Sequence, residues 1–267
     1  MTEPQPPSPT EFLASEAGEA MPRLAFRRRD GRGPRLVWLG GYGSDMAGTK
    51  AEALDTFAAD RGQAFLRLDY AGHGESEGAF RDGTISSWTR DAARVLAAVS
   101  TPDEPVVLVG SSMGAWIALR LALGRAGPAP NLAGLLLIAP APDFTARLLE
   151  PKLTPKERAD LAAQGFFAVP SPYGPEPTIY TARLIEDGRD AAVMTQPIKV
   201  GAPVRVLQGM EDPDVPFAHA LALVELMPFD DVVTTLIRDG DHRLSRPQDI
   251  DRMLRAAEEL SAQAASV

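Results

Sequence analysis

Short apolar runs alternate with longer runs of mixed polarity along most of the chain. The short apolar runs have the length that is typical of strands, and the longer runs repeat apolar residues at helical spacing. The predicted strands span residues 24–29, 35–41, 63–70, 105–110, 132–140, 203–209 and 231–239. The predicted helices span residues 48–60, 85–99, 112–126, 216–227 and 246–264.

The order of these elements indicates the class of fold. Several strands are apolar on both faces, as strands are when helices cover both sides of a sheet. Alternating strands and helices therefore predict an α/β fold with a mostly parallel central sheet. Residues 143–200 interrupt the alternation with many prolines, no clear strand, and helical patterns at 145–150, 155–165 and 178–192. We expect a small helical insertion over the carboxyl ends of the strands, where open α/β sheets bind ligands. A peripheral helical excursion is the alternative.

Length and composition are those of one large soluble domain, which we assign to residues 22–267, insertion included. Residues 1–21 are rich in proline, glutamate and serine and are predicted to form a disordered or loosely docked tail. They lack the basic and apolar parts of a secretory signal. No apolar run approaches the roughly 18 residues that a membrane span needs. A soluble cytoplasmic protein is therefore expected.

Charge and residue types narrow the possible functions. A net charge of −9 argues against a broad surface for nucleic acid or anionic membrane. The absence of cysteine excludes disulfides, a catalytic thiolate and a cysteine-based zinc site. Because the chain has only three histidines, it offers few ligands for a catalytic metal. Neither a metal nor a cofactor is expected.

The pattern Gly-x-Ser-x-Gly occurs twice, at residues 74–78 and 110–114. The second copy follows an apolar strand and leads at once into a helix, whose first N–H groups and positive dipole end can stabilise an oxyanion. This context predicts Ser112 as a nucleophile. Ser76 instead precedes a glycine-containing segment without helical spacing and lies between two glutamates, so it is expected in a loop.

A nucleophilic serine needs a neighbouring base, normally a histidine that a carboxylate orients. After an elbow of this kind the order along the chain is serine, acid, histidine, which favours His242, in the loop before the last helix. His73 precedes Ser112 and lies between two glycines, which indicates a turn residue. His219 lies within a helical pattern, which indicates packing or a solvated face.

The acid is expected after the strand at 203–209. Asp212 and Asp214 both follow that strand, but Asp214 stands where it could cap the next helix. Asp212 is therefore preferred. Asp214 is the alternative, and Asp143, which follows the preceding strand, is a distant third.

Two main-chain N–H groups are expected to bind the oxyanion. One belongs to Met113, which follows the nucleophile, and the other to the glycine-rich loop at residues 40–43. We predict the N–H of Tyr42 as the second donor, with that of Gly41 as the alternative.

The insertion is expected to select the substrate. It is dense in apolar and aromatic residues for a chain with 6% aromatic residues, and such residues over the strand ends would line an apolar pocket. The candidates are Phe144, Leu148, Leu149, Phe166, Phe167, Tyr173 and Tyr180. Phe166, Phe167 and Tyr173 are the predicted substrate-binding residues. The alternative is that Phe166 and Phe167 only pack the insertion onto the sheet.

Five stretches carry the candidate residues and their surroundings: LGGYGSDMAGTK (39–50), RLDYAGHGESEG (67–78), GSSMGAW (110–116), GMEDPDVP (209–216) and DGDHRLSRP (239–247). They resemble the α/β-hydrolases, and within them the mycophenolic acid acyl-glucuronide esterase and palmitoyl-protein thioesterase branch and its bacterial relatives. The resemblance implies an α/β-hydrolase fold that hydrolyses esters or thioesters through an acyl-enzyme, without a cofactor. It also supports Ser112, Asp212 and His242 as the triad.

The leading hypothesis is thus a serine ester or thioester hydrolase that acts on a small-molecule or acyl-protein substrate. A catalytically silent binding protein and an acyltransferase on the same fold are the alternatives. An intact serine, aspartate and histidine in the right order argue against the silent protein.

Overall fold

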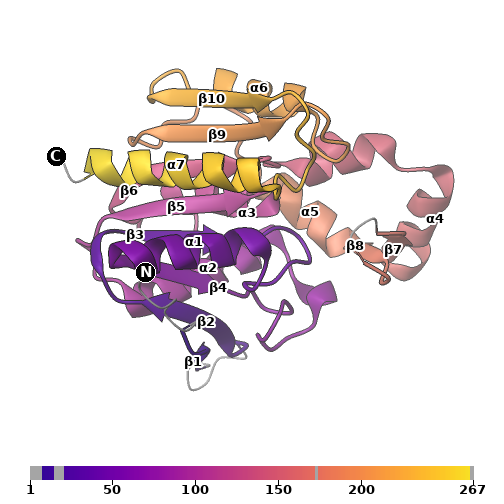
Figure 1. The fold of residues 1–267 in the computed structure, drawn as a ribbon. Coiled ribbons are helices and arrows are strands. Elements are labelled where there is room, and N and C mark those ends of the chain that lie inside the picture. The colour runs from indigo at the N-terminus through magenta and orange to yellow at the C-terminus, as the bar shows by residue number, and fades with distance from the viewer. Residues whose placement is uncertain (1–7, 15–20, 172–173, 265–267) are drawn as a thin grey trace.

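The computed structural model describes residues 8–14, 21–171 and 174–264, whose strands form a central sheet (Figure 1). Within these residues the sheet has eight strands in the order β1-β2-β4-β3-β5-β6-β9-β10. β2 pairs antiparallel with β1 and β4, and the other neighbouring strands are parallel. The strands are β1 (Glu11–Leu13), β2 (Leu24–Arg29), β3 (Arg32–Leu39), β4 (Gln63–Leu68), β5 (Val106–Ser111), β6 (Leu132–Ile138), β9 (Val204–Gly209) and β10 (Val232–Ile237).

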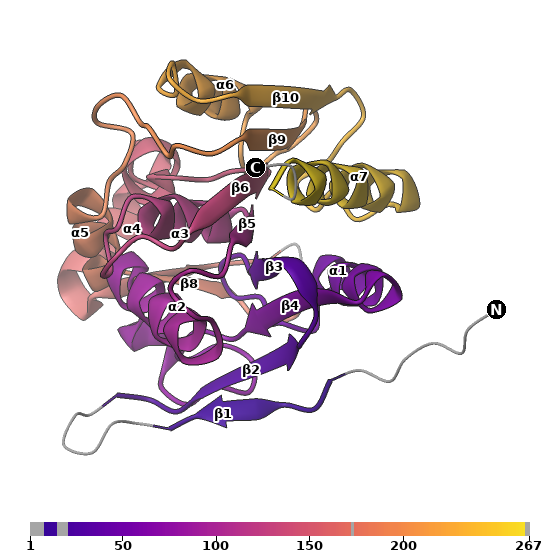
Figure 2. The same ribbon diagram turned by 90° about the vertical axis from the view of Figure 1, so that its left-hand side faces the viewer.

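Helices cover both faces of the sheet, which confirms the predicted α/β fold. The helices around the sheet are α1 (Thr49–Arg61), η1 (Phe80–Asp82), α2 (Ile85–Val99), α3 (Met113–Ala122), α6 (Phe217–Glu225) and α7 (Pro247–Ala264). α1 and α7 lie on one face, and α2, α3 and α6 lie on the other (Figure 2). Each face has its own apolar core, with Phe57 and Leu260 in one and Trp88 and Trp116 in the other.

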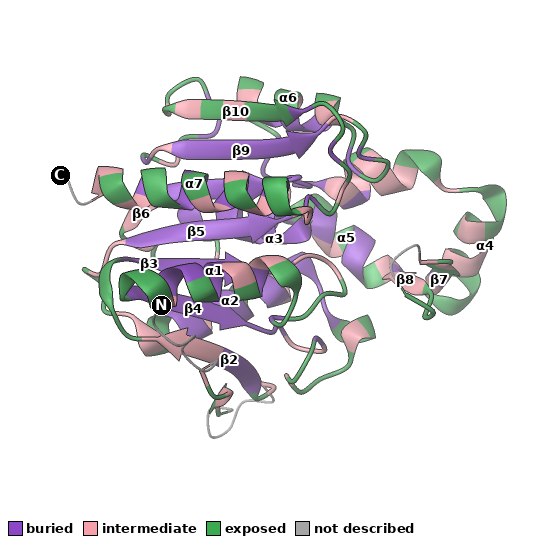
Figure 3. Ribbon diagram, viewed as in Figure 1, coloured by how far each residue is buried: buried purple, intermediate pink, exposed green. Residues whose placement is uncertain are grey.

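The middle of the sheet is buried on both sides (Figure 3). Every residue of β4, β5 and β9 is buried, as expected for strands that helices cover on both faces. Because β3, β5, β6, β9 and β10 are parallel, the loops that follow them meet at one edge of the sheet. That edge is where the residues predicted to act chemically come together.

The insertion between β6 and β9 forms a cap that projects from this edge (Figure 1). Its elements are η2 (Thr145–Leu149), η3 (Glu150–Lys152), α4 (Pro155–Gln164), β7 (Phe166–Val169), β8 (Thr178–Thr181) and α5 (Ala182–Asp190). The expectation of a strand-free insertion was wrong, because β7 and β8 pair as an antiparallel hairpin. Thr-Ile-Tyr-Thr favours a strand over a helix, and α5 begins only where Thr181 caps it by accepting a hydrogen bond from the Leu184 N–H.

The segment expected as a tail contributes the edge strand β1, at the opposite side of the sheet from β10. Residues 11–13 of the segment expected to be disordered or loosely docked form β1 and pair with β2. Glu11 forms an ion pair with Arg28, and the Arg23 guanidinium lies 4.2 Å from the centroid of the Phe12 ring. Residues 1–7 and 15–20 of that segment lie outside the described residues. None of the helices in the described part of the chain is long and apolar enough to cross a membrane.

Candidate active site

Ser112 occupies a tight turn between β5 and α3. Its φ of 54° and ψ of −117° are strained for a residue with a side chain, and such strain persists only where the surroundings hold it. Two flanking glycines make the turn possible. A Cβ on Gly110 would lie 2.4 Å from the Gly114 oxygen, and a Cβ on Gly114 would lie 2.0 Å from the Leu39 oxygen. The predicted strand–turn–helix elbow is therefore present, with Ser112 at the N-terminal end of α3.

His242 lies between Ser112 and Asp212 and contacts both. Its Nδ1 is 2.8 Å from the Asp212 Oδ2, and its Nε2 is 3.1 Å from the Ser112 Oγ. An ionised carboxylate only accepts hydrogen bonds, so Nδ1–H donates to Asp212 and Nε2 is left to accept from the serine hydroxyl. The structure thus brings together three residues that come from the loops after β5, β9 and β10.

The Asp212 carboxylate is buried and held by the turn that follows β9. Its Oδ1 accepts hydrogen bonds from the N–H groups of Asp214, at 2.9 Å, and Val215, at 2.8 Å. Its Oδ2 accepts a further one from the Gln208 side chain at 3.3 Å. Asp214 is exposed, so of the two candidate acids it is Asp212 that is built into the protein.

Gln208 contacts the Asp212 carboxylate, and the sequence did not lead us to expect this. It is fully buried in β9, and besides Asp212 its amide donates to the oxygens of Gly209 and Val215. The available signal was a polar residue inside an apolar strand, since buried polar groups are normally hydrogen-bonded. The oxygen and nitrogen atoms of Asp212, Asp214 and His242 that could bind a metal lie within 4.8 Å of one another. In Asp212 these oxygens already accept the hydrogen bonds described above.

The loop after β3 lies beside Ser112, as predicted for the second oxyanion donor. A Cβ added to Gly41 would stand 3.5 Å from the Ser112 Cβ, so the main chain approaches the nucleophile closely there. Tyr42 and Met113 line the same cavity as Ser112. Their N–H groups stay the predicted donors to the oxyanion.

The Tyr42 side chain points into the cap. Its hydroxyl donates a hydrogen bond to the Ile179 oxygen at 2.5 Å, and its ring stacks on Tyr180 with the centroids 5.3 Å apart. Burial raises the pKa of the Tyr42 hydroxyl well above its usual range, so it remains a donor at neutral pH. The loop beside Ser112 is thereby joined to β8.

His73, which was predicted to be a turn residue, also holds the loop at residues 40–43 by a hydrogen bond. Its Nε2 accepts a hydrogen bond from the Gly43 N–H at 3.2 Å, and its Nδ1 lies 3.3 Å from the Ala71 oxygen, to which it donates. Burial lowers the pKa of His73 to about 4, which keeps the ring neutral and able to accept. Tyr70 adds a hydrogen bond to the Gly40 oxygen.

The other two residues set aside on sequence grounds have structural contacts. Ser76 accepts a hydrogen bond from the Ala25 N–H at 2.8 Å and donates one to the Asp69 oxygen at 2.7 Å, in the loop after β4. His219 is buried in α6, with its Nε2 2.9 Å from the Pro142 oxygen.

A cavity of about 530 Å³ opens above Ser112 and His242, between the sheet edge and the cap. Four of the predicted insertion residues line it, namely Phe144, Leu148, Leu149 and Tyr180. Phe166 and Phe167, which were predicted to bind substrate, are not among the residues that line this cavity. Phe167 is 2% exposed and stacks against Tyr180, while Phe166 packs under the Arg81 guanidinium at 4.2 Å. Both hold the cap hairpin in place, and Tyr173 lies outside the described residues.

Residues 12–256 match the model of the alpha/beta hydrolase family. The chain belongs to the alpha/beta hydrolase family. The mostly parallel sheet with helices on both faces is thus the alpha/beta hydrolase fold.

Members of this family that resemble the chain include a mitochondrial palmitoyl-protein thioesterase, ABHD10, from Mus musculus. It is 33% identical over 243 residues, which cover 90% of this chain and 79% of the relative. The structure of the mouse protein superimposes with a TM-score of 0.83 at 30% identity, over 95% of this chain and 98% of that one. A crystal structure from Agrobacterium vitis S4, named in general terms as a hydrolase, is 51% identical with a TM-score of 0.90, over 96% of this chain and 100% of that one.

Proposed function

We propose that this protein is a serine hydrolase that cleaves carboxylic ester or thioester bonds. The observation that carries the proposal is the hydrogen-bonded chain from Ser112 through His242 to the buried Asp212, at the floor of a cavity that apolar cap residues help to line. A serine held in this way can be deprotonated as it attacks, because the imidazole accepts its proton and the carboxylate stabilises the resulting charge.

The reaction follows from the positions of these groups. The Ser112 Oγ attacks the acyl carbonyl carbon while the His242 Nε2 takes the hydroxyl proton. The carbonyl oxygen becomes an oxyanion, to which the N–H groups of Met113 and Tyr42 donate. The intermediate then collapses, the alcohol or thiol leaves with the proton from His242, and the acyl group stays on Ser112. Water that His242 deprotonates attacks this acyl-enzyme and releases the acid.

The cavity supports an apolar acyl group as the part of the substrate that the cap selects. Phe144, Leu148 and Leu149 of the cap line the space above Ser112. Burying each methylene of an acyl chain against such a surface stabilises the complex by about 0.8 kcal/mol. The name of the mouse relative, a palmitoyl-protein thioesterase, supports long acyl chains and thioesters within this proposal.

A fluorophosphonate probe tests the proposal, because it phosphonylates a serine that a neighbouring base activates. We expect stoichiometric labelling of the wild-type protein and none of Ser112→Ala. Hydrolysis of acyl esters and acyl thioesters, followed as release of the free acid, should disappear in the same variant. A wild-type protein that neither reacts with the probe nor releases acid would instead be the silent binding protein.

A further inference from the structure

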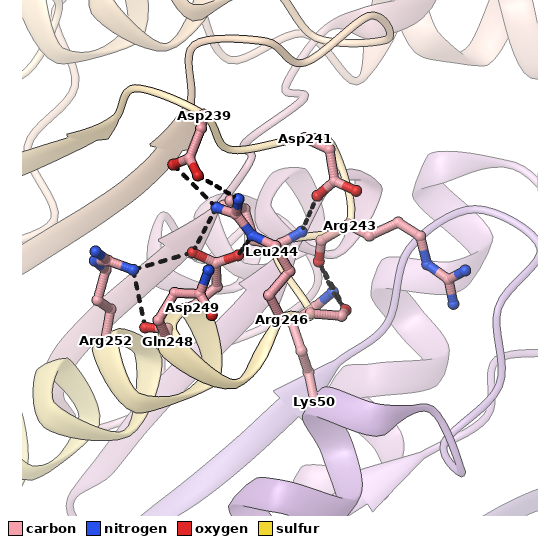
Figure 4. Close-up of polar contacts among 10 residues, drawn as sticks. Lys50, Asp239, Asp241, Arg243, Leu244, Arg246, Gln248, Asp249 and Arg252 are labelled. Atoms are coloured by element: carbon pink, nitrogen blue, oxygen red, sulfur yellow. Dashed lines mark hydrogen bonds and ion pairs between the residues drawn. The ribbon is translucent and has the colours of Figure 1, made fainter.

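Lys50 contacts the loop that carries His242, although the two residues are far apart in the sequence. It lies in the first turn of α1, and its Nζ donates hydrogen bonds to the main-chain oxygen of Arg243 and to the Ser245 Oγ, the latter at 3.3 Å (Figure 4). Arg243 directly follows His242 in the sequence. The contact therefore acts on the main chain one residue beyond His242.

The loop has a conformation that needs such support. Leu244 has a φ of 43°, in the left-handed region that is unfavourable for a leucine, and its side chain is buried. Its N–H donates to the Asp241 Oδ1 at 2.9 Å, and the Ser245 hydroxyl donates to the Arg243 oxygen at 3.0 Å. The Arg243 oxygen thus accepts hydrogen bonds from both Lys50 and Ser245, and Lys50 is the donor that comes from outside the loop.

The charged groups around the loop are paired mainly with one another. Arg246 contacts Asp239 at 2.7 Å and Asp249 at 2.6 Å, and Arg252 adds a contact to Asp249 at 3.2 Å (Figure 4). Within the described residues, the structure gives Lys50 no carboxylate at ion-pair distance. Its ammonium is therefore committed to the Arg243 oxygen and the Ser245 hydroxyl.

We propose that Lys50 is a positioning residue, which holds the loop of His242 so that the imidazole reaches Ser112 and Asp212 together. The inference rests on the proposed function, because only a proton transfer between Ser112 and His242 needs this alignment. Lys50 lines the same cavity as Ser112 and His242, and it acts on the imidazole through the main chain of Arg243.

The charge on Lys50 makes this role sensitive to pH. Burial and the nearby Arg243 lower the pKa of Lys50, and Asp241 and Asp249 raise it in part, with the result at about 8. A charged donor makes a stronger hydrogen bond than a neutral amine. Since the ammonium is the positioning form, its effect is half lost at about pH 8 and disappears as the pH rises further.

The test measures how fast a fluorophosphonate labels Ser112 between pH 6 and pH 10 in the full-length protein. We expect the wild-type rate to fall above about pH 8. Lys50→Arg keeps a charge at every pH tested, because the guanidinium pKa lies above about 12. Its labelling rate should stay on a plateau to pH 10. Lys50→Met should label about tenfold more slowly than the wild type at pH 7, the change that the loss of one charged hydrogen bond makes in a rate.

Lys156→Met is the matched control. Lys156 lies on α4, is fully exposed, and pairs only with Asp160 among the contacts of the described residues, so this variant should keep the wild-type rate and pH profile. Circular dichroism and thermal unfolding check that each variant is folded. If Lys50→Met does not fold, the position of the alkaline limb in Lys50→Arg decides.

Two results would overturn the inference: an unchanged labelling rate in folded Lys50→Met, or an alkaline limb in Lys50→Arg that coincides with that of the wild type. These outcomes are distinct from a failure of the proposed function, in which the wild-type protein itself would not be labelled at Ser112.

Discussion

The hydroxyl of Tyr42 donates a hydrogen bond of 2.5 Å to the main-chain oxygen of Ile179. Tyr42 belongs to the loop that lies beside Ser112, and Ile179 lies in β8 of the cap. The part of the site that would stabilise the oxyanion and the part that would select the acyl group are therefore joined by one side chain. Movement of the cap hairpin would therefore displace the loop beside Ser112.

Tyr42→Phe tests this coupling, because it removes the hydrogen bond and keeps the stacking ring. It leaves the partly buried Ile179 oxygen with one partner fewer, which should cost about 1 kcal/mol of unfolding free energy. We also expect kcat to fall for every acyl chain length, since the loop beside Ser112 loses its anchor. Urea unfolding and a chain-length series of p-nitrophenyl esters measure the two effects. Wild-type kcat in a destabilised Tyr42→Phe would show that the bond stabilises the cap alone.

Asp212→Asn should lose far more activity than Asp214→Asn. The amide at 212 can present an N–H to His242 and force the wrong tautomer, a defect that costs about 10⁴-fold in kcat in triads of this kind. Asp214 is exposed and supports Asp212 with its main-chain N–H, which the Asp214→Asn variant would retain, so its loss should stay below about tenfold. Steady-state kinetics of both variants on one ester decide between the two acids. Equal losses would reassign the acid.

Ser112→Ala and Ser76→Ala should separate activity from stability. The first removes the nucleophile and should abolish both hydrolysis and probe labelling at little cost in stability. The second removes two hydrogen bonds, to the Ala25 N–H and the Asp69 oxygen, and should lower the unfolding free energy by about 1–2 kcal/mol while hydrolysis continues. Denaturant unfolding beside an activity assay gives both values. Loss of labelling in a folded Ser76→Ala would contradict the assignment of the nucleophile.

Leu148→Ala and Leu149→Ala should change the preferred acyl length, because both side chains line the cavity. Each lost methylene contact is worth about 0.8 kcal/mol, or roughly fourfold in kcat/KM for a long chain. Acetyl esters, which do not reach the cap, should be hydrolysed at the wild-type rate. Phe166→Ala is the control, since Phe166 packs against Arg81 outside the cavity and should keep the wild-type profile. A shift in Phe166→Ala alone would place the acyl group on the other side of the hairpin.

His73 should make the folded state sensitive to acid. Burial lowers its pKa from an ordinary 6.5 to about 4, so the unfolded chain takes up the proton more readily. Its contribution to stability is present above pH 6.5 and is lost as the pH falls towards 4. His73→Gln keeps an acceptor for the Gly43 N–H without titrating, so its unfolding free energy should fall less between pH 7 and pH 4.5 than that of the wild type. Urea unfolding at both pH values measures the difference. Identical losses in the wild type and in His73→Gln would exclude His73 as a source of the acid sensitivity.

Local patterns along the chain were sufficient for most of the fold. Apolar runs of strand length and helical spacing placed the strands from β2 to β10 of the main sheet, apart from the cap, and the helices on both of its faces. The context of Ser112, between an apolar strand and a helix, predicted the elbow because so tight a turn needs small flanking residues and exposes the serine at the start of the helix. Ser112 and Asp212, the residues preferred as nucleophile and acid, are also the two that are hydrogen-bonded to His242. A cytoplasmic location stays a prediction.

The tertiary structure decided what depends on contacts between distant residues. Asp212 and Asp214 are two positions apart and have the same side chain. What distinguishes them is the turn, which directs two N–H groups at the Asp212 carboxylate. Whether Phe167 faced the cavity or the cap depended on the pairing of β7 with β8, which periodicity over so few residues does not specify. Lys50 and Arg243 are 193 positions apart, as no local pattern could show. Hydrophobic spacing reports which side of an element is buried, whereas partners across the fold are set by how the elements pack.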